Sequence, residues 1–121
     1  MAKALRVDEP GTNKFKIVDI ELPNITEGQV LIKSKYSSLN YKDALAVTGQ
    51  GKILRSFPLI PGIDVCGEII ESQSQHFQQG DLVLQTGGNL GETYNGGFSE
   101  QVVLGEQNCF CLLYTSDAAD E

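Results

Sequence analysis

The chain has 121 residues and a mass of 13.1 kDa, which is room for one domain with an ordinary hydrophobic core and too little for a two-domain enzyme. No apolar run approaches the roughly 18 residues of a membrane span, and Met1–Arg6 does not lead into the apolar block of a secretory signal, so we expect no membrane as a partner. Only 9 scattered Lys and Arg residues face 16 Asp and Glu residues, and the net charge of -7 argues against nucleic acid as a partner. Composition therefore favours an acidic cytoplasmic protein.

Apolar and β-prone runs predict three strands in the first third of the chain. Residues 2–7 alternate and lead into the turn formers of 8–13, a pattern typical of a strand followed by a hairpin-like loop. A second β-rich run, 14–22, stops before Pro23 because proline cannot donate to a sheet ladder. Residues 29–37 alternate over the longest stretch and predict a third strand.

A short helix is predicted after the third strand. Asn40 can cap residues 41–47, and Gly49 and Gly51 tolerate the left-handed conformations that end a helix. The segment has room for only one or two turns.

The rest of the chain predicts further strands and little helix. The apolar run 63–70 contains Gly67, which predicts a bulge or a close backbone approach. Residues 82–84 read as a short buried strand, the five glycines of 87–97 as a flexible loop, and 98–104 as the last strand. Five or six short strands indicate a mainly β fold, a small barrel or a sandwich.

The cysteines and the C-terminal segment need separate interpretations. Three cysteines without metal-like spacing favour reduced thiols, and Cys66 is interpreted as a small core residue, whereas His76 is expected to be exposed. Residues 111–121 show neither strand alternation nor a helical stripe, and they resemble the translated end of a transposase-type sequencing adapter. We therefore expect a domain at residues 1–110 and a non-native tail at 111–121.

Polar side chains that could bind a ligand gather in two loops, one after the third predicted strand and one before the next. The motifs are Ser-Ser-Leu-Asn-Tyr-Lys-Asp-Ala-Leu at 37–45, Ser-Phe-Pro-Leu-Ile-Pro-Gly-Ile-Asp at 56–64 and Gly-Phe-Ser-Glu at 97–100. With these motifs the chain resembles the medium-chain dehydrogenase/reductase superfamily. More narrowly, it is similar to the zinc-independent, quinone-oxidoreductase-like branch that includes the acrylyl-CoA reductases.

The resemblance implies a fold and a missing part. Residues 1–110 would form a GroES-like, partly open β-barrel with short helices, the N-terminal catalytic domain of the family. Complete members continue into a dinucleotide-binding domain that holds most of the NADPH. The glycines of 87–97 do not replace that domain, because no helix is predicted after them as a dinucleotide fingerprint requires. A homodimer is expected for the complete protein.

The resemblance also predicts that no metal binds. Zinc-dependent relatives carry a cysteine where Asn40 stands and a histidine where Ile63 stands. An amide and an alkyl group cannot replace thiolate and imidazole as zinc ligands.

The expected chemistry without zinc is hydride delivery from NADPH to an activated C=C bond, and hydrogen-bond donors would stabilise the developing charge. The preferred substrate is a short enoyl thioester such as acrylyl-CoA. The resemblance places cofactor contact at Tyr41, whose hydroxyl could instead meet the substrate carbonyl. Asn40 could donate through its amide, and Asp64 could orient a ribose hydroxyl, so these three residues are the catalytic candidates.

Each assignment has an alternative. Tyr41 could be a half-buried packing residue, Asn40 only a helix cap, and Lys42 and Asp43 a solvated pair. A quinone or an alkenal could be the substrate. The barrel could also be a non-enzymatic binding module, as in co-chaperonins, because fold alone does not determine function.

Overall fold

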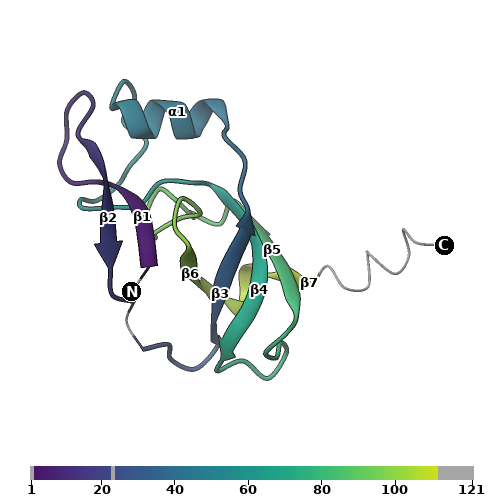
Figure 1. Cartoon of the computed structure of the whole chain (residues 1–121). Coiled ribbons are helices and arrows are strands. Elements are labelled where there is room, and N and C mark those ends of the chain that lie inside the picture. The colour runs from purple at the N-terminus through teal and green to yellow at the C-terminus, as the bar shows by residue number, and fades with distance from the viewer. Residues whose placement is uncertain (1, 23, 112–121) are drawn as a thin grey trace.

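The computed structural model describes residues 2–22 and 24–111. Figure 1 shows a mainly β architecture with one α-helix at one end. Its elements are β1 (Ala2–Val7), β2 (Phe15–Ile20), β3 (Gln29–Tyr36), α1 (Tyr41–Thr48), β4 (Asp64–Ser72), β5 (Leu82–Thr86), β6 (Gln101–Gly105), the 3₁₀ turn η1 (Glu106–Asn108) and β7 (Phe110–Cys111).

The strands form two antiparallel sheets. β1 and β2 make a two-stranded sheet, and the larger sheet has the order β6-β3-β4-β5-β7. A flat five-stranded sheet would hold its outer strands about 19 Å apart, four spacings of about 4.8 Å. Only η1 and Cys109 connect β6 to β7, and this connection is too short for that span, so the sheet curls. The result is the partly open, GroES-like barrel that the sequence predicted.

The core lies inside this curled sheet. Alternate residues of the strands point inward, as Val30 and Ile32 of β3 show by being fully buried. Burying a side chain of this size stabilises the fold by about 1.5–3 kcal/mol. The buried cluster consists of Val30, Ile32, Val65, Ile69, Val83, Leu90, Val102, Leu104 and Cys109.

Most predicted elements are confirmed within a few residues. The strand predicted at 98–104 begins later, at Gln101, because residues 98–100 instead bond to β1 through Leu5 N–H to Phe98 O and Glu100 N–H to Lys3 O. β7 was not predicted. It includes Cys111, which had been assigned to the tail, and the remaining predicted tail residues, 112–121, lie outside the described residues.

Cys66 in β4 and His76 in the loop after it were both interpreted from the sequence. Cys66 is not a core residue, because it lies on the outer face with Asp64 and Glu68 while Val65 and Ile69 point inward. Burial still raises the pKa of the Cys66 thiol, and Lys35 acts in the opposite direction. His76 is exposed, as expected. No helix in the described part of the chain has both the length and the hydropathy to cross a membrane.

Gly67 is a point of close backbone approach, as predicted. It pairs with Ser34, and the β3–β4 register shifts beside this pair. A Cβ at Gly67 would lie 2.3 Å from the Lys33 carbonyl oxygen. The approach of β3 and β4 therefore requires a residue without a side chain.

Gly67→Ala should destabilise the fold because the carbonyl of Lys33 belongs to the rigid ladder. Overpacking of this kind costs about 1–3 kcal/mol, and each kcal/mol lowers the unfolding midpoint by about 4–8 °C in a small domain. Gly105→Ala is the matched control in β6, since a Cβ there meets only the flexible Gln107 side chain. Equal thermal midpoints for the two variants would contradict the assignment.

Candidate functional site

The site begins where the loop after β3 meets the start of β4. Asp64, the first residue of β4, accepts hydrogen bonds from the Ser38 backbone N–H at 2.8 Å and from the Ser38 hydroxyl. The Asn40 side-chain amide adds a third bond, from Nδ2 to Asp64 Oδ2 at 3.2 Å. The two loops that carry the sequence motifs are thus joined through one carboxylate.

A second carboxylate, that of Asp43, lies fully buried beneath them. Its Oδ2 accepts from the backbone N–H and the Nδ2 of Asn40, both at 3.1 Å, and its Oδ1 accepts from the Ile63 N–H at 3.0 Å. The alternative of a solvated Lys42–Asp43 pair is therefore wrong. Lys42 instead pairs with Glu92 at 2.7 Å, and this ion pair links α1 to the glycine-rich loop.

Asn40 lies at the centre of the network. It is the N-cap residue of α1, as predicted, and the bond from its N–H to Asp43 is the reciprocal half of a capping box. Its carboxamide also does more than a cap, because Nδ2 has only two hydrogens and lies within 3.2 Å of three acceptors: Ser38 Oγ, Asp43 Oδ2 and Asp64 Oδ2. The amide therefore separates two carboxylates that would otherwise repel each other.

The Asp64 carboxyl is held in its ionised form. Burial raises its pKa, but the hydrogen bonds from Ser38 and Asn40 together outweigh burial and hold the pKa below the ordinary value of 3.8. Asp64 is therefore an anion whose hydrogen-bond donors, Ser38 and Asn40, are fixed in place.

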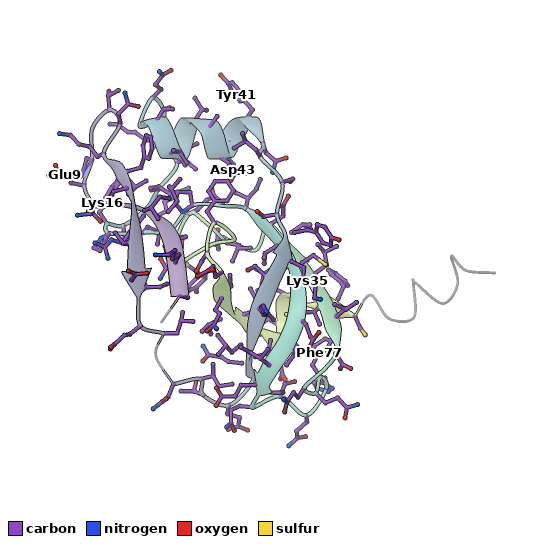
Figure 2. All side chains as sticks on the ribbon, viewed as in Figure 1. Glu9, Lys16, Lys35, Tyr41, Asp43 and Phe77 are labelled. Carbon is purple, nitrogen blue, oxygen red and sulfur yellow. The ribbon has the colours of Figure 1, made fainter. Side chains whose placement is uncertain are left out.

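Tyr41 lies apart from this network. Its side chain is 81% exposed, which excludes the half-buried packing alternative. Figure 2 shows Tyr41 on the outer side of α1 and Asp43 on the side that faces the sheets. Tyr36 and Leu39 are also largely exposed, at 75% and 74%. The structure thus brings Asn40 and Asp64 into contact and presents Tyr41 to solvent.

Two contributors were missed by sequence reasoning. Ser38 gave no signal beyond its place beside Asn40. The glycine-rich loop was predicted to be flexible, yet it packs backbone to backbone against the turn before β4: a Cβ at Gly96 would lie 2.2 Å from Gly62 O, and Gly97 N–H donates to that oxygen at 3.0 Å. The density of glycines could have indicated this close approach.

The groups around Asn40 present hydrogens to one another's carboxylates. Asn40 turns its NH₂ group toward the carboxylates, and Ile63 contributes only a backbone N–H. Within residues 2–22 and 24–111, no three His, Cys, Asp or Glu side chains are grouped so that they could hold a metal ion.

Asp64→Asn should remove a pH-dependent part of the stability. Because the folded-state pKa of Asp64 is lowered, its contribution is present above 3.8 and is lost as pH falls from there through the lower folded-state pKa. We expect the variant to melt below the wild type at about pH 7 and the difference to shrink at about pH 3. Asp19→Asn, which removes an exposed ion pair with Lys3, is the control and should change little at either pH. A difference for Asp64→Asn that does not change with pH would contradict the stated pKa direction.

Comparison with known proteins gives a consistent result. The family model of the alcohol dehydrogenase GroES-like domain matches residues 26–113. The protein named "Probable acrylyl-CoA reductase AcuI" of Escherichia coli is 43% identical over 101 residues, which are 84% of this chain and 31% of that protein. Quinone oxidoreductases are also among the relatives.

Solved structures agree with these relatives. The yhdH oxidoreductase of Salmonella enterica, in complex with NADP, aligns with a TM-score of 0.83 and 38% identity over 93% of this chain and 35% of its own. The yhfP protein of Bacillus subtilis, with NAD bound, aligns with a TM-score of 0.84 and 34% identity over 92% of this chain and 34% of its own. The chain thus spans about a third of the length of the curated relatives it matches. Because the family model covers most of its length, the chain belongs to the alcohol dehydrogenase GroES-like domain family.

Proposed function

We propose that this chain is the N-terminal catalytic part of an NADPH-dependent oxidoreductase that reduces an activated C=C bond, with a short enoyl thioester such as acrylyl-CoA as substrate. The observation that carries the proposal is an exposed Tyr41 that directly follows Asn40, whose amide is held by the Asp43 and Asp64 carboxylates. Support comes from the relatives, which include a protein named as an acrylyl-CoA reductase and a structure with NADP.

The chain's own residues divide the work in this proposal. The cofactor, held mainly by a nucleotide-binding domain outside this chain, supplies the hydride when bound. Tyr41 has no hydrogen-bond partner among the described residues, so its hydroxyl is free to donate to the nicotinamide amide or to the substrate carbonyl, where negative charge develops.

Asn40 and Asp64 have roles other than donating to the reacting groups. Both N–H groups of the Asn40 amide are engaged by acceptors, so Asn40 positions the loop that carries Tyr41. Asp64 is bonded on both oxygens, yet an ionised carboxylate has about four acceptor positions, so it keeps capacity for a ribose hydroxyl of the cofactor.

A quinone or alkenal reductase is the second candidate, favoured by the quinone oxidoreductases among the relatives. Both candidates use the same hydride chemistry and differ in the acceptor. We further propose a cytoplasmic homodimer for the complete protein, acting on a small molecule.

We also propose that the protein works without zinc, because Asn40 and Ile63 offer an N–H donor and an alkyl group where a metal would need lone pairs. Elemental analysis of the purified protein should find no stoichiometric zinc. One tightly held zinc per chain that is lost on Asn40→Ala substitution would refute the proposal.

Activity should require more than this chain, since hydride transfer needs the nicotinamide held within about 3–3.5 Å of the acceptor carbon. We expect no NADPH-dependent reduction of acrylyl-CoA by the 121 residues alone. A chimera of residues 1–110 with the remaining two thirds of the E. coli relative should reduce it. Turnover by the isolated chain would contradict the proposal that a separate nucleotide-binding domain must hold the cofactor.

Within the active chimera, Tyr41→Phe should lower kcat/KM several-fold, because a hydrogen bond to a neutral group is worth about 0.5–1.5 kcal/mol. Tyr94→Phe removes a hydroxyl from an exposed tyrosine of the glycine-rich loop and serves as the control. Unchanged kinetics for Tyr41→Phe would remove Tyr41 from the site, and a preference for quinones over acrylyl-CoA would favour the second candidate.

A further inference from the structure

The loop that follows α1 differs in charge from the rest of the chain. Residues 44–63 form the longest stretch without a carboxylate, although the chain carries 16 Asp and Glu residues and a net charge of -7. Two cations, Lys52 and Arg55, lie in this stretch, and both are exposed. They belong to the segment that leads from α1 toward β4 in Figure 1, and we call residues 49–58 the basic loop.

Neither cation is neutralised by the protein itself. Six of the nine Lys and Arg residues form ion pairs within the described chain, and Lys52 and Arg55 are among the three that do not. The Arg55 backbone N–H donates to the Glu92 carbonyl oxygen at 2.8 Å, yet the Glu92 carboxylate is engaged by Lys42 at 2.7 Å. Both side chains therefore keep their donors for an anion from outside the described chain.

The basic loop is held at both of its ends and between them. Near its start, Gly51 lies so close to α1 that a Cβ there would be 3.3 Å from the Cβ of Leu45. Just after its end, Leu59 exchanges two backbone hydrogen bonds with Val7 of β1, at 2.8 and 2.9 Å. The bond from Arg55 N–H adds a third point of attachment. The cations are thus carried by a fixed segment.

This segment lies near the candidate site without being part of its hydrogen-bond network. The ion pair of Glu92 connects the Arg55 backbone to Lys42, which directly follows Tyr41. Gly51 packs one helical turn beyond Tyr41. From the rise of a helix and the spacing of residues, the two cations lie on the order of 10–15 Å from Tyr41. They are placed to bind a part of a ligand that is distant from its reacting atoms.

We propose that the basic loop binds the phosphate groups of a CoA thioester through Arg55 and Lys52. This inference rests on the proposed function. In a CoA thioester the pantetheine arm separates the acyl group from the phosphates, as the two cations are separated from Tyr41. A guanidinium binds phosphate through two parallel hydrogen bonds, and an ammonium adds a point charge.

The basic loop also distinguishes between the two candidate substrates. A quinone or an alkenal carries no phosphate and gains nothing from exposed cations. NADPH carries phosphates, but the nucleotide-binding domain outside this chain is proposed to hold most of that cofactor. The charge of the basic loop therefore favours a CoA thioester as the acceptor.

Binding of CoA to the 121-residue chain tests the contact without any reaction. In an NMR titration, CoA should shift the backbone amide signals of Lys52 and Arg55, whereas pantetheine, which lacks phosphates, should not. The shifts should weaken as salt is added, because exposed charges are screened. The double variant Lys52→Gln/Arg55→Gln should lose the response. Lys33→Gln, which removes the remaining cation without an ion pair from β3, is the matched control and should keep it.

Kinetics of the chimera of residues 1–110 with the remainder of the E. coli relative test the role in catalysis. The double variant should raise KM for acrylyl-CoA by about tenfold or more and change kcat little, since charge-assisted hydrogen bonds to a remote group are lost. KM for NADPH should stay unchanged, as should KM for the acrylyl thioester of N-acetylcysteamine, which has no phosphate. Equal thermal midpoints for the double variant and the wild type would show that the fold is retained.

Several results would overturn the proposal. Shifts that pantetheine reproduces, or that Lys33→Gln removes to the same extent, would mean that the basic loop does not recognise phosphate. An unchanged KM for acrylyl-CoA would leave Lys52 and Arg55 as solvated surface residues, and a higher KM for NADPH alone would assign them to the cofactor. A chimera that reduces quinones but not acrylyl-CoA would refute the proposed function, and the titration with CoA would then decide whether the basic loop binds phosphate.

Discussion

The buried carboxylate of Asp43 is the interaction on which the site depends. An ionisable group without access to water is costly unless hydrogen bonds surround it, and here they come from the two segments that must be joined. The Asn40 N–H belongs to the start of α1, and the Ile63 N–H belongs to the turn before β4. The same contact that makes Asp43 tolerable in the interior thus fixes α1 against the barrel and, with it, the direction in which Tyr41 points.

Close backbone packing at the turn before β4 also holds the segment that carries Asp64. The turn at Gly62 lies against Gly91, Gly96 and Gly97 at distances that leave no room for a Cβ. The hydrogen bond from Ile63 N–H to Asp43 and the close packing of Gly62 against these glycines together fix the start of β4. Asp64 is therefore carried by a rigid segment, which is what a group that orders a ligand requires.

The sequence predicted the β architecture well because hydrophobic alternation and turn residues are local signals. The period of two in residues 29–36 and the cap at Asn40 needed no knowledge of the rest of the chain. The burial of Asp43 could not be predicted, since the charge pattern of α1 alone reads as a solvated face. It depends on the Ile63 N–H, twenty residues away in sequence. The pairing of residues 98–100 with β1 is non-local in the same way.

That pairing also bears on how the domain forms in a cell. β1 is synthesised some ninety residues before its partners at Phe98 and Glu100, and about fifty residues before Leu59, which bonds to Val7. At about 5–20 residues per second, β1 waits on the order of 5–20 s before its contacts with residues 98–100 can form. Ala4 of β1, which pairs with Ser99 and is buried in the finished fold, is transiently exposed apolar surface during this interval.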